Sequence, residues 1–86
     1  MPRISEFFGI VIYMYYNDHQ PPHFHAEYGD EEAIYEIETL AILRGELPRR
    51  ANAMVAEWAL QHRDELRDNW TRARQQTPLN RIDPLN

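Results

Sequence analysis

The hydrophobic pattern changes its period near residue 47, and this change constrains the fold of the 86-residue chain more than any other feature. Before it, short segments are either continuously apolar or alternate between apolar and polar residues, as β-strands do. After it, apolar residues recur every three or four positions, as in an amphipathic helix. We therefore predict one α+β domain over residues 1–86, with a sheet in 1–46, a helix in 47–75 and an extended, proline-containing tail in 76–86.

The first half predicts an antiparallel β-meander of about four strands. The segment 7–16 is rich in aromatic and β-branched residues, which favours one inner strand. The segments 23–28, 33–38 and 40–43 predict three more strands. The connections between these segments are too short for the crossovers of a parallel sheet, so the pairing should be antiparallel.

The second half predicts one long helix that begins near Pro48, ends near Gln75 and lies across the sheet. Proline is well placed in a first helical turn, where its missing N–H would have no partner. Trp58 and Leu66 lie in the apolar arc of this helix, so we expect both in the core.

Three of the four histidines lie within the short segment 19–25. His23 and His25 should project from the same face of one strand, roughly 6–7 Å apart at Cα, which suits two ligands of one metal ion. His19 or Glu27 could supply a third ligand, and such a donor set favours zinc or another divalent transition ion. The same histidines could instead perform metal-free acid–base chemistry. In the simplest alternative, His23 and His25 lie on a solvated strand face, each bonded to a separate neighbour.

His62 lies near the middle of the helix's apolar arc, where a polar ring needs a hydrogen-bond partner. One interpretation is a structural histidine held by Glu65 or by a carbonyl of the sheet. In the other, His62 and Glu65 meet the histidines of the loop across the helix–sheet interface. The candidate catalytic residues would then be His19, His23, His25, His62 and Glu65.

Charge and composition exclude several classes of function. The formal net charge is −5, and no block of basic residues suggests a phosphate track, so the overall field does not support nucleic-acid binding. The chain has no cysteine, which excludes disulfides and thiolate metal sites. Its longest apolar run is about half of the ~20 residues that a membrane helix needs, and its start lacks the features of a secretory signal. We therefore expect a cytoplasmic protein with no membrane partner.

The motif Asn-Asp-His-Gln-Pro-Pro-His-Phe-His at 17–25 resembles the head of the family catalogued as domain of unknown function 4160. The segment 57–66, followed by Asn69 and Trp70, is similar to the helical signature of that family, and 82–85 is similar to its tail. Genes of this family often stand beside a gene for domain of unknown function 2442, in pairs that look like toxin–antitoxin modules. The resemblance thus implies a small partner protein encoded by a neighbouring gene.

Three functions follow as expectations. The first is a component of a bacterial two-protein module, of toxin–antitoxin type, that binds its partner through a sheet edge or through the tail. The second is a small histidine-dependent ribonuclease or metal-dependent hydrolase. The third is a stand-alone regulatory or structural domain whose histidines only stabilise the fold.

Overall fold

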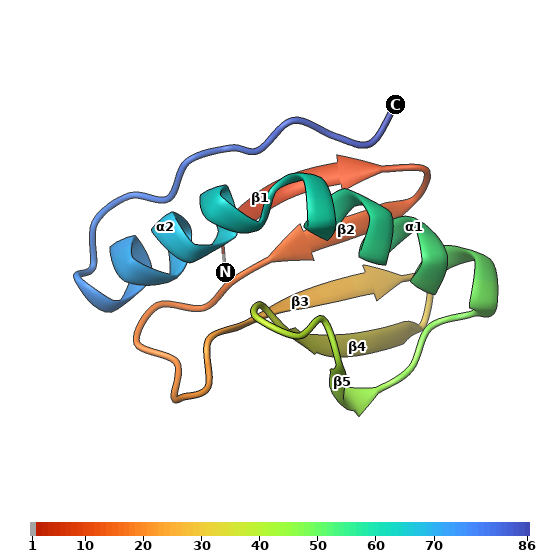
Figure 1. Cartoon of the computed structure of the whole chain (residues 1–86), viewed down its shortest axis with the longest axis horizontal. Helices are drawn as coiled ribbons and strands as arrows, with labels where there is room; N and C mark the ends of the chain where they lie inside the picture. Colours follow the sequence, from red (N-terminus) through yellow and green to blue (C-terminus); the bar gives the residue numbers. More distant parts are fainter. Residues whose placement is uncertain (1) are drawn as a thin grey trace.

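The computed structural model describes residues 2–86 and has the predicted α+β class. Its sheet has the strand order β1-β2-β3-β4-β5, and the helices follow the sheet in the chain (Figure 1). The elements are β1 (Arg3–Phe7), β2 (Ile10–Tyr13), β3 (His23–Tyr28), β4 (Glu31–Glu36), β5 (Ile42–Gly45), α1 (Arg49–Gln61) and α2 (Arg63–Arg74). Each strand pairs antiparallel with the next one in sequence, which confirms the predicted meander.

The sheet has five strands rather than about four, because the apolar segment 7–16 is not one strand. The chain reverses at Phe8 and Gly9, so that Phe7 pairs with Ile10. Both turn residues have a positive φ, 49° and 82°, as a type I′ hairpin turn requires. Glycine adopts this conformation easily, but Phe8 makes the turn look like the interior of an apolar strand.

One face of the sheet is covered by the helices, and strand alternation decides which residues are buried there. Phe24 of β3 and Tyr35 of β4 are direct cross-strand partners on this face, and their rings stack at a centroid distance of 5.3 Å. Trp58 of α1 packs against Phe24, with the ring centroids 5.9 Å apart. Trp58 and Leu66 are fully buried, as predicted. The odd-numbered residues at the start of β3, His23 and His25, therefore project from the opposite face.

The prediction of one helix over 47–75 is wrong, because the helix is interrupted at His62. The backbone of His62 has φ −124° and ψ 24°, which is outside the helical range. The second helix begins with two carboxylates in its first turn, where negative charge favours a helix N-terminus. Arg63 donates a hydrogen bond to the carbonyl of Ile37, which fixes the start of α2 against the sheet. Within residues 2–86, neither helix is long and apolar enough to cross a membrane.

The tail after α2 is extended, as predicted, and it packs against the body of the molecule. Ile82 and Leu85 are buried, and the N–H of Ile82 donates to the carbonyl of Ile4 in β1 at 2.7 Å. The Nε1–H of Trp58 donates to the carbonyl of Asp83 at 2.8 Å. The tail thus runs beside β1 (Figure 1), while β5 is the other edge strand of the sheet.

Candidate functional site

The connection between β2 and β3, residues 14–22, brings side chains over the sheet face opposite Phe24 and Tyr35, where α2 also reaches it. His23 and His25 project onto that face from β3, yet they are only 6% and 7% exposed. The ring of His25 stacks on Tyr13 at 5.0 Å and meets Tyr15 edge-on at 4.8 Å. Trp70 of α2 packs against His23 at 5.1 Å. The two histidines share one face, as predicted, but aromatic rings shield them from solvent.

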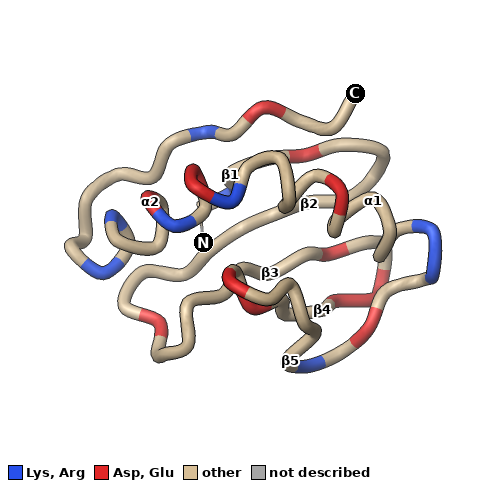
Figure 2. Tube along the Cα trace, in the orientation of Figure 1, with Lys and Arg blue, Asp and Glu red and all other residues tan. Residues whose placement is uncertain are grey.

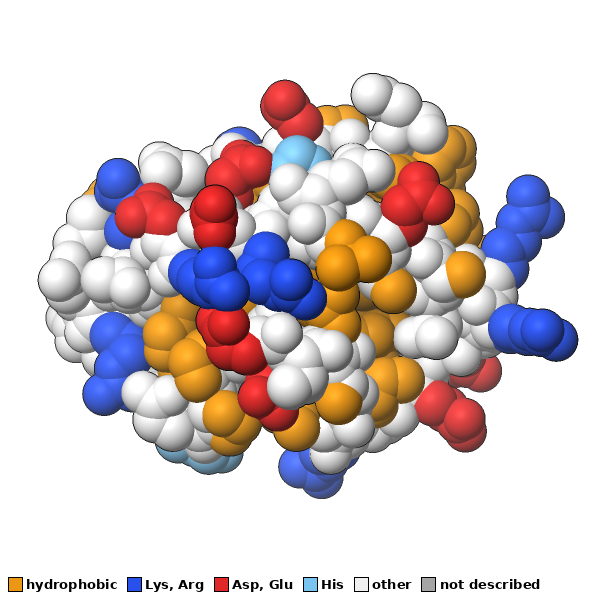
Figure 3. Space-filling view, viewed as in Figure 1, with side chains coloured by type: hydrophobic (Ala, Val, Ile, Leu, Met, Phe, Trp, Pro, Cys, Tyr) orange, Lys and Arg blue, Asp and Glu red, His pale blue; other side chains and the backbone are white. Residues whose placement is uncertain are grey.

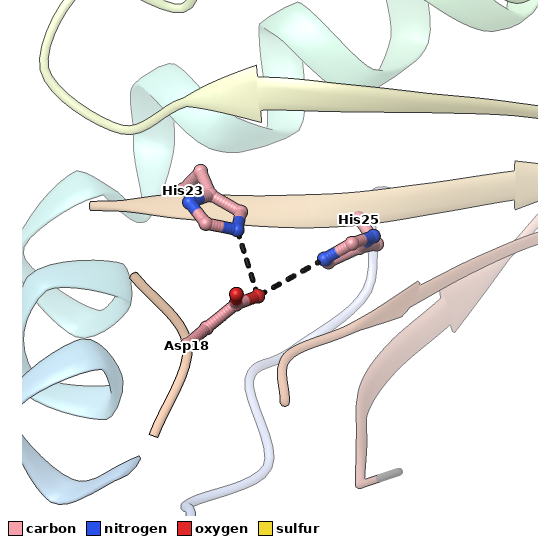
Figure 4. A group of neighbouring side chains, drawn as sticks. All are labelled: Asp18, His23 and His25. Carbon is pink, nitrogen blue, oxygen red and sulfur yellow. Dashed lines mark hydrogen bonds and ion pairs between the residues drawn. The ribbon is translucent and has the colours of Figure 1, made fainter. Parts of the chain in front are cut away.

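The carboxylate of Asp18 lies between these two rings (Figure 4). Its Oδ2 is 2.8 Å from Nε2 of His23 and 3.5 Å from Nε2 of His25. One potential ligand atom from each of the three residues lies within 4.8 Å of the other two. The structure thus assembles two imidazoles and one carboxylate around a single point.

The hydrogen bonds of His23 fix the roles of its two ring nitrogens. Its Nδ1 is 2.7 Å from the carbonyl of Pro21, which can only accept, so Nδ1 carries a proton and donates it. Its Nε2 faces the carboxylate of Asp18, which also only accepts when it is ionised. A proton or a metal ion must therefore lie between Nε2 and the carboxylate.

Two pKa shifts describe the electrostatics of this cluster. Burial acts to raise the pKa of Asp18, but the hydrogen bonds from His23 and from the backbone of His19 outweigh it and lower that pKa. Burial lowers the pKa of His25, and its hydrogen bond to Asp18 opposes that shift only in part. The lowered pKa values favour the ionised form of Asp18 and the neutral form of His25, which are the forms that bind a metal ion.

His25 has an unused polar atom within the described residues. Its side chain is 9% exposed, and its Nδ1 has no hydrogen-bond partner there. The closest carboxylate oxygen, Oε2 of Glu32, is 3.9 Å away, which is within ion-pair reach but too long for a hydrogen bond. A buried, unsatisfied polar atom costs about 1–3 kcal/mol. Oγ of Ser5 and Nε1 of Trp70 are unsatisfied in the same way.

The cluster lies in a cleft of about 450 Å³. This volume is in the range of small-molecule sites, which are typically about 300–1,000 Å³. The cleft is lined by the three clustered residues together with Tyr15, His19, Gln20, Pro21, Ile34, Leu43 and Arg44.

The other residues of the predicted metal site lie outside the cluster. The side chain of His19 is 92% exposed, and its Nδ1 contacts Oδ1 of Asp18 at 3.2 Å from the rim. Glu27 pairs with Val11 and Glu32 on neighbouring strands and is not among the clustered residues. Asp18 stands in the place where His19 or Glu27 was expected. Asp18 belongs to the motif at 17–25 in the sequence, but nothing in that motif singled it out as a ligand.

His62 and Glu65 do not meet the histidines of the loop. Nδ1 of His62 bonds to Oε1 of Glu65, and the ring of His62 packs against Trp58 at 5.6 Å. Both residues line a separate depression of about 440 Å³ that contains no residue of the Asp18 cluster. This geometry matches the interpretation of His62 as a structural histidine held by Glu65.

Comparison with known proteins identifies a family. The family model described as Domain of unknown function (DUF4160) matches residues 9–71, which is most of the chain and includes all three clustered residues. No curated protein and no solved structure is significantly similar to the chain.

Proposed function

This chain belongs to the DUF4160 family, and we propose that it is a hydrolase whose divalent metal ion is held by Asp18, His23 and His25. The donor set supports the proposal, because catalytic zinc sites use three protein ligands of this kind and leave a fourth position to water or substrate. Zinc–ligand bonds of about 2.0–2.1 Å place tetrahedral ligands roughly 3.3 Å apart. The separations of 2.8 and 3.5 Å in this cluster lie on either side of that value.

The hydrogen bond from Nδ1 of His23 to the carbonyl of Pro21 is the observation that carries the proposal. Metal-ligating histidines usually donate their other ring N–H to a carbonyl or carboxylate, which fixes the tautomer and the ring orientation. His23 already has this arrangement, so its Nε2 lone pair is directed at the point that Asp18 and His25 share.

A divalent ion at this point would supply a nucleophile at neutral pH, because zinc lowers the pKa of a bound water to about 7. The residues of the chain would position the ion and the substrate. Asp18, His23 and His25 would fix the position of the ion, and the cleft would hold the substrate beside it. This is the hydrolase alternative of the sequence analysis, with Asp18 in place of His19.

The test is a zinc titration of the metal-free protein by calorimetry, together with metal analysis. We expect one zinc per chain for the wild type and a loss of affinity of at least tenfold for Asp18→Asn, which removes a charged ligand but keeps the shape of the side chain. Glu65→Gln is the matched control, because it makes the same carboxylate-to-amide change beside a different histidine. Equal zinc affinities of the two variants would refute the proposed site.

Metal-free acid–base catalysis by the same residues predicts a different outcome in an assay of ester hydrolysis. Hydrolysis of test esters that survives chelation of all metal, but is lost in His25→Gln, would favour the ribonuclease-like alternative. Hydrolysis that is lost on chelation and restored by added zinc would favour the metal centre.

A second candidate function is the binding of a small partner protein, and the edge strand β5 favours it. Ile42 and Leu43 are 41% and 45% exposed there, although apolar side chains of this size are usually buried. The tail is already packed against β1, so β5 is the sheet edge where a partner strand can add. The test is native mass spectrometry of a mixture with the protein encoded by the neighbouring gene.

We expect Ile42→Lys to weaken that complex, since a charge on an edge strand opposes strand addition. Leu60→Lys is the control, because Leu60 is a 61% exposed apolar residue on α1. Absence of a complex with the wild type, or equal binding by both variants, would exclude β5 as the docking edge.

A further inference from the structure

The inference in this subsection rests on the proposed metal centre and concerns its substrate. We infer that the substrate is a small molecule with an oxyanion group, such as a phosphate or a carboxylate, and that Arg44 binds this group. Arg44 lines the same cleft as Asp18, His23 and His25. It also lines an adjoining hollow of about 400 Å³ that reaches His25 and Glu32. Arg44 of β5 therefore lines both hollows next to the ligand cluster.

The strand register places Arg44 on the same sheet face as the clustered histidines. Tyr13 pairs with His25, His25 pairs with Ile34, and Ile34 pairs with Arg44. These four residues form one row across β2, β3, β4 and β5, and direct cross-strand partners share a face. Since neighbouring strands lie about 4.8 Å apart, His25 and Arg44 are roughly 10 Å apart at Cα, with only Ile34 between them. An arginine side chain that extends over Ile34 can reach a substrate bound beside His25.

A β-bulge puts Arg44 on this face. Tyr35 pairs with Ile42 but Ile34 pairs with Arg44, so Leu43 is an extra residue in β5. Without it, strand alternation would place Arg44 on the helix-covered face with Ile42. Bulges often redirect a side chain towards a functional site.

Arg44 is also free to bind an anion. Within residues 2–86 it makes no ion pair and no side-chain hydrogen bond, whereas Arg67 is held by Glu38 and Arg72 by Asp68. An unpaired guanidinium beside metal ligands can form bidentate, charge-assisted hydrogen bonds to a phosphate or a carboxylate.

The surrounding charges favour a small anion over a nucleic acid. Residues 1–46 carry nine acidic residues and only two arginines, Arg3 and Arg44, whereas most arginines lie in residues 47–86 (Figure 2). The face of the molecule in Figure 3 shows no continuous basic track. The formal net charge of −5 repels a polyanion. A single arginine in a cleft of about 450 Å³ instead suits one anionic group on a small substrate.

The test measures the binding of phenylphosphonate and of benzoate to the zinc-loaded protein by calorimetry. These probes share an aryl group and differ in the oxyanion. We expect Arg44→Ala to weaken the preferred probe by about ten- to a hundredfold, the range for charge-assisted hydrogen bonds, with zinc affinity unchanged. Arg44→Lys should fall in between, because it keeps the charge and loses the planar fork. Arg81→Ala is the control, since it removes the same charge from an exposed residue of the tail.

The outcomes separate this inference from the proposed function. If Arg44→Ala binds zinc and both probes as the Arg81→Ala control does, the anion site is refuted while the metal centre stands. If the wild type binds no zinc, the metal centre fails, and Arg44-dependent binding of phenylphosphonate to the metal-free protein would still support the anion site. A single-stranded RNA bound more tightly than phenylphosphonate, with the same dependence on Arg44, would overturn the assignment of a small substrate.

Discussion

At the scale of single residues, buried polar groups of this protein follow two different patterns. The hydroxyl of Tyr35 donates to Oδ1 of Asn52 at 2.7 Å, so a core tyrosine is satisfied by a helix side chain. His25, in contrast, keeps a nitrogen without a hydrogen-bond partner in the part of the chain that the structure describes. The hydrogen bond of Tyr35 therefore contributes to stability, whereas the unsatisfied Nδ1 of His25 costs free energy.

Tyr35 makes the stability of the protein sensitive to alkali. Burial raises the pKa of Tyr35 to about 12 from its usual value of 10. A tyrosine whose pKa is higher in the folded state stabilises the fold fully below pH 10, and this stabilisation is lost as the pH rises towards 12. We expect the melting temperature to fall between these pH values in the wild type and to fall less in Tyr35→Phe. Parallel curves for the two proteins would show that Tyr35 does not titrate as its burial implies.

Trp58 is the residue whose truncation should cost most. It is fully buried, it packs against Phe7 and Phe24, and its Nε1–H is bonded to the tail. We expect Trp58→Ala to lower the free energy of unfolding by about 3–5 kcal/mol in urea denaturation. Leu60→Ala, an exposed change two positions away, should stay within about 0.5 kcal/mol of the wild type.

At the scale of elements, the sequence predicted those parts of the fold that depend on periodicity. The strand over 23–28, the burial of Trp58 and Leu66 and the common face of His23 and His25 all follow from alternation or helical spacing. The turn at Phe8 and Gly9 and the break at His62 do not. An apolar run conceals the first, and the second has neither glycine nor proline to mark it.

Periodicity also decided which residues of the candidate site could be predicted: His23 and His25 could, whereas Asp18 and Arg44 could not. Two histidines two residues apart share a strand face wherever the strand lies, so the sequence identified them. The position of Asp18 depends on the path of the connection between β2 and β3, and that of Arg44 depends on the bulge in β5. Neither the path nor the bulge has a periodic signal, so both residues become apparent only in three dimensions.

The bulge leads to a prediction about Gly45. A Cβ atom at this position would lie 2.1 Å from the backbone oxygen of Glu32, and the φ of 74° is strained for other residues. We expect Gly45→Ala to shift β5, to destabilise the protein by more than the roughly 1–2 kcal/mol of left-handed strain alone, and to weaken anion binding through Arg44. Gly29→Ala is the matched control, because its φ is 60° but a Cβ there would have open space around it. Equal destabilisation by the two variants would mean that the contact with Glu32 has no role.

At the scale of the whole molecule, the tail completes the core rather than extending from it. Ile82 and Leu85 are buried, and the carbonyl of Asp83 accepts a hydrogen bond from the core tryptophan. A chain truncated after Arg81 loses both apolar side chains, each worth about 1.5–3 kcal/mol when fully buried. We expect this truncation to lower the free energy of unfolding by several kcal/mol in chemical denaturation, whereas Asp83→Ala, which keeps the backbone, should have little effect. Unchanged stability of the truncated chain would show that the tail is not part of the core.

The unequal edges of the sheet set a limit on how the protein can associate. A sheet with two open edges can accept a strand on each side, so its copies can polymerise. Within residues 2–86, the tail is bonded to β1 through Ile82 and Ile4, and β5 is the opposite edge of the sheet, so β5 is the position for an incoming strand. A strand-adding partner would therefore bind with a stoichiometry of one per chain, and two copies joined through β5 would leave only tail-covered edges outside. We therefore expect association through this sheet to stop at two strands joined along β5.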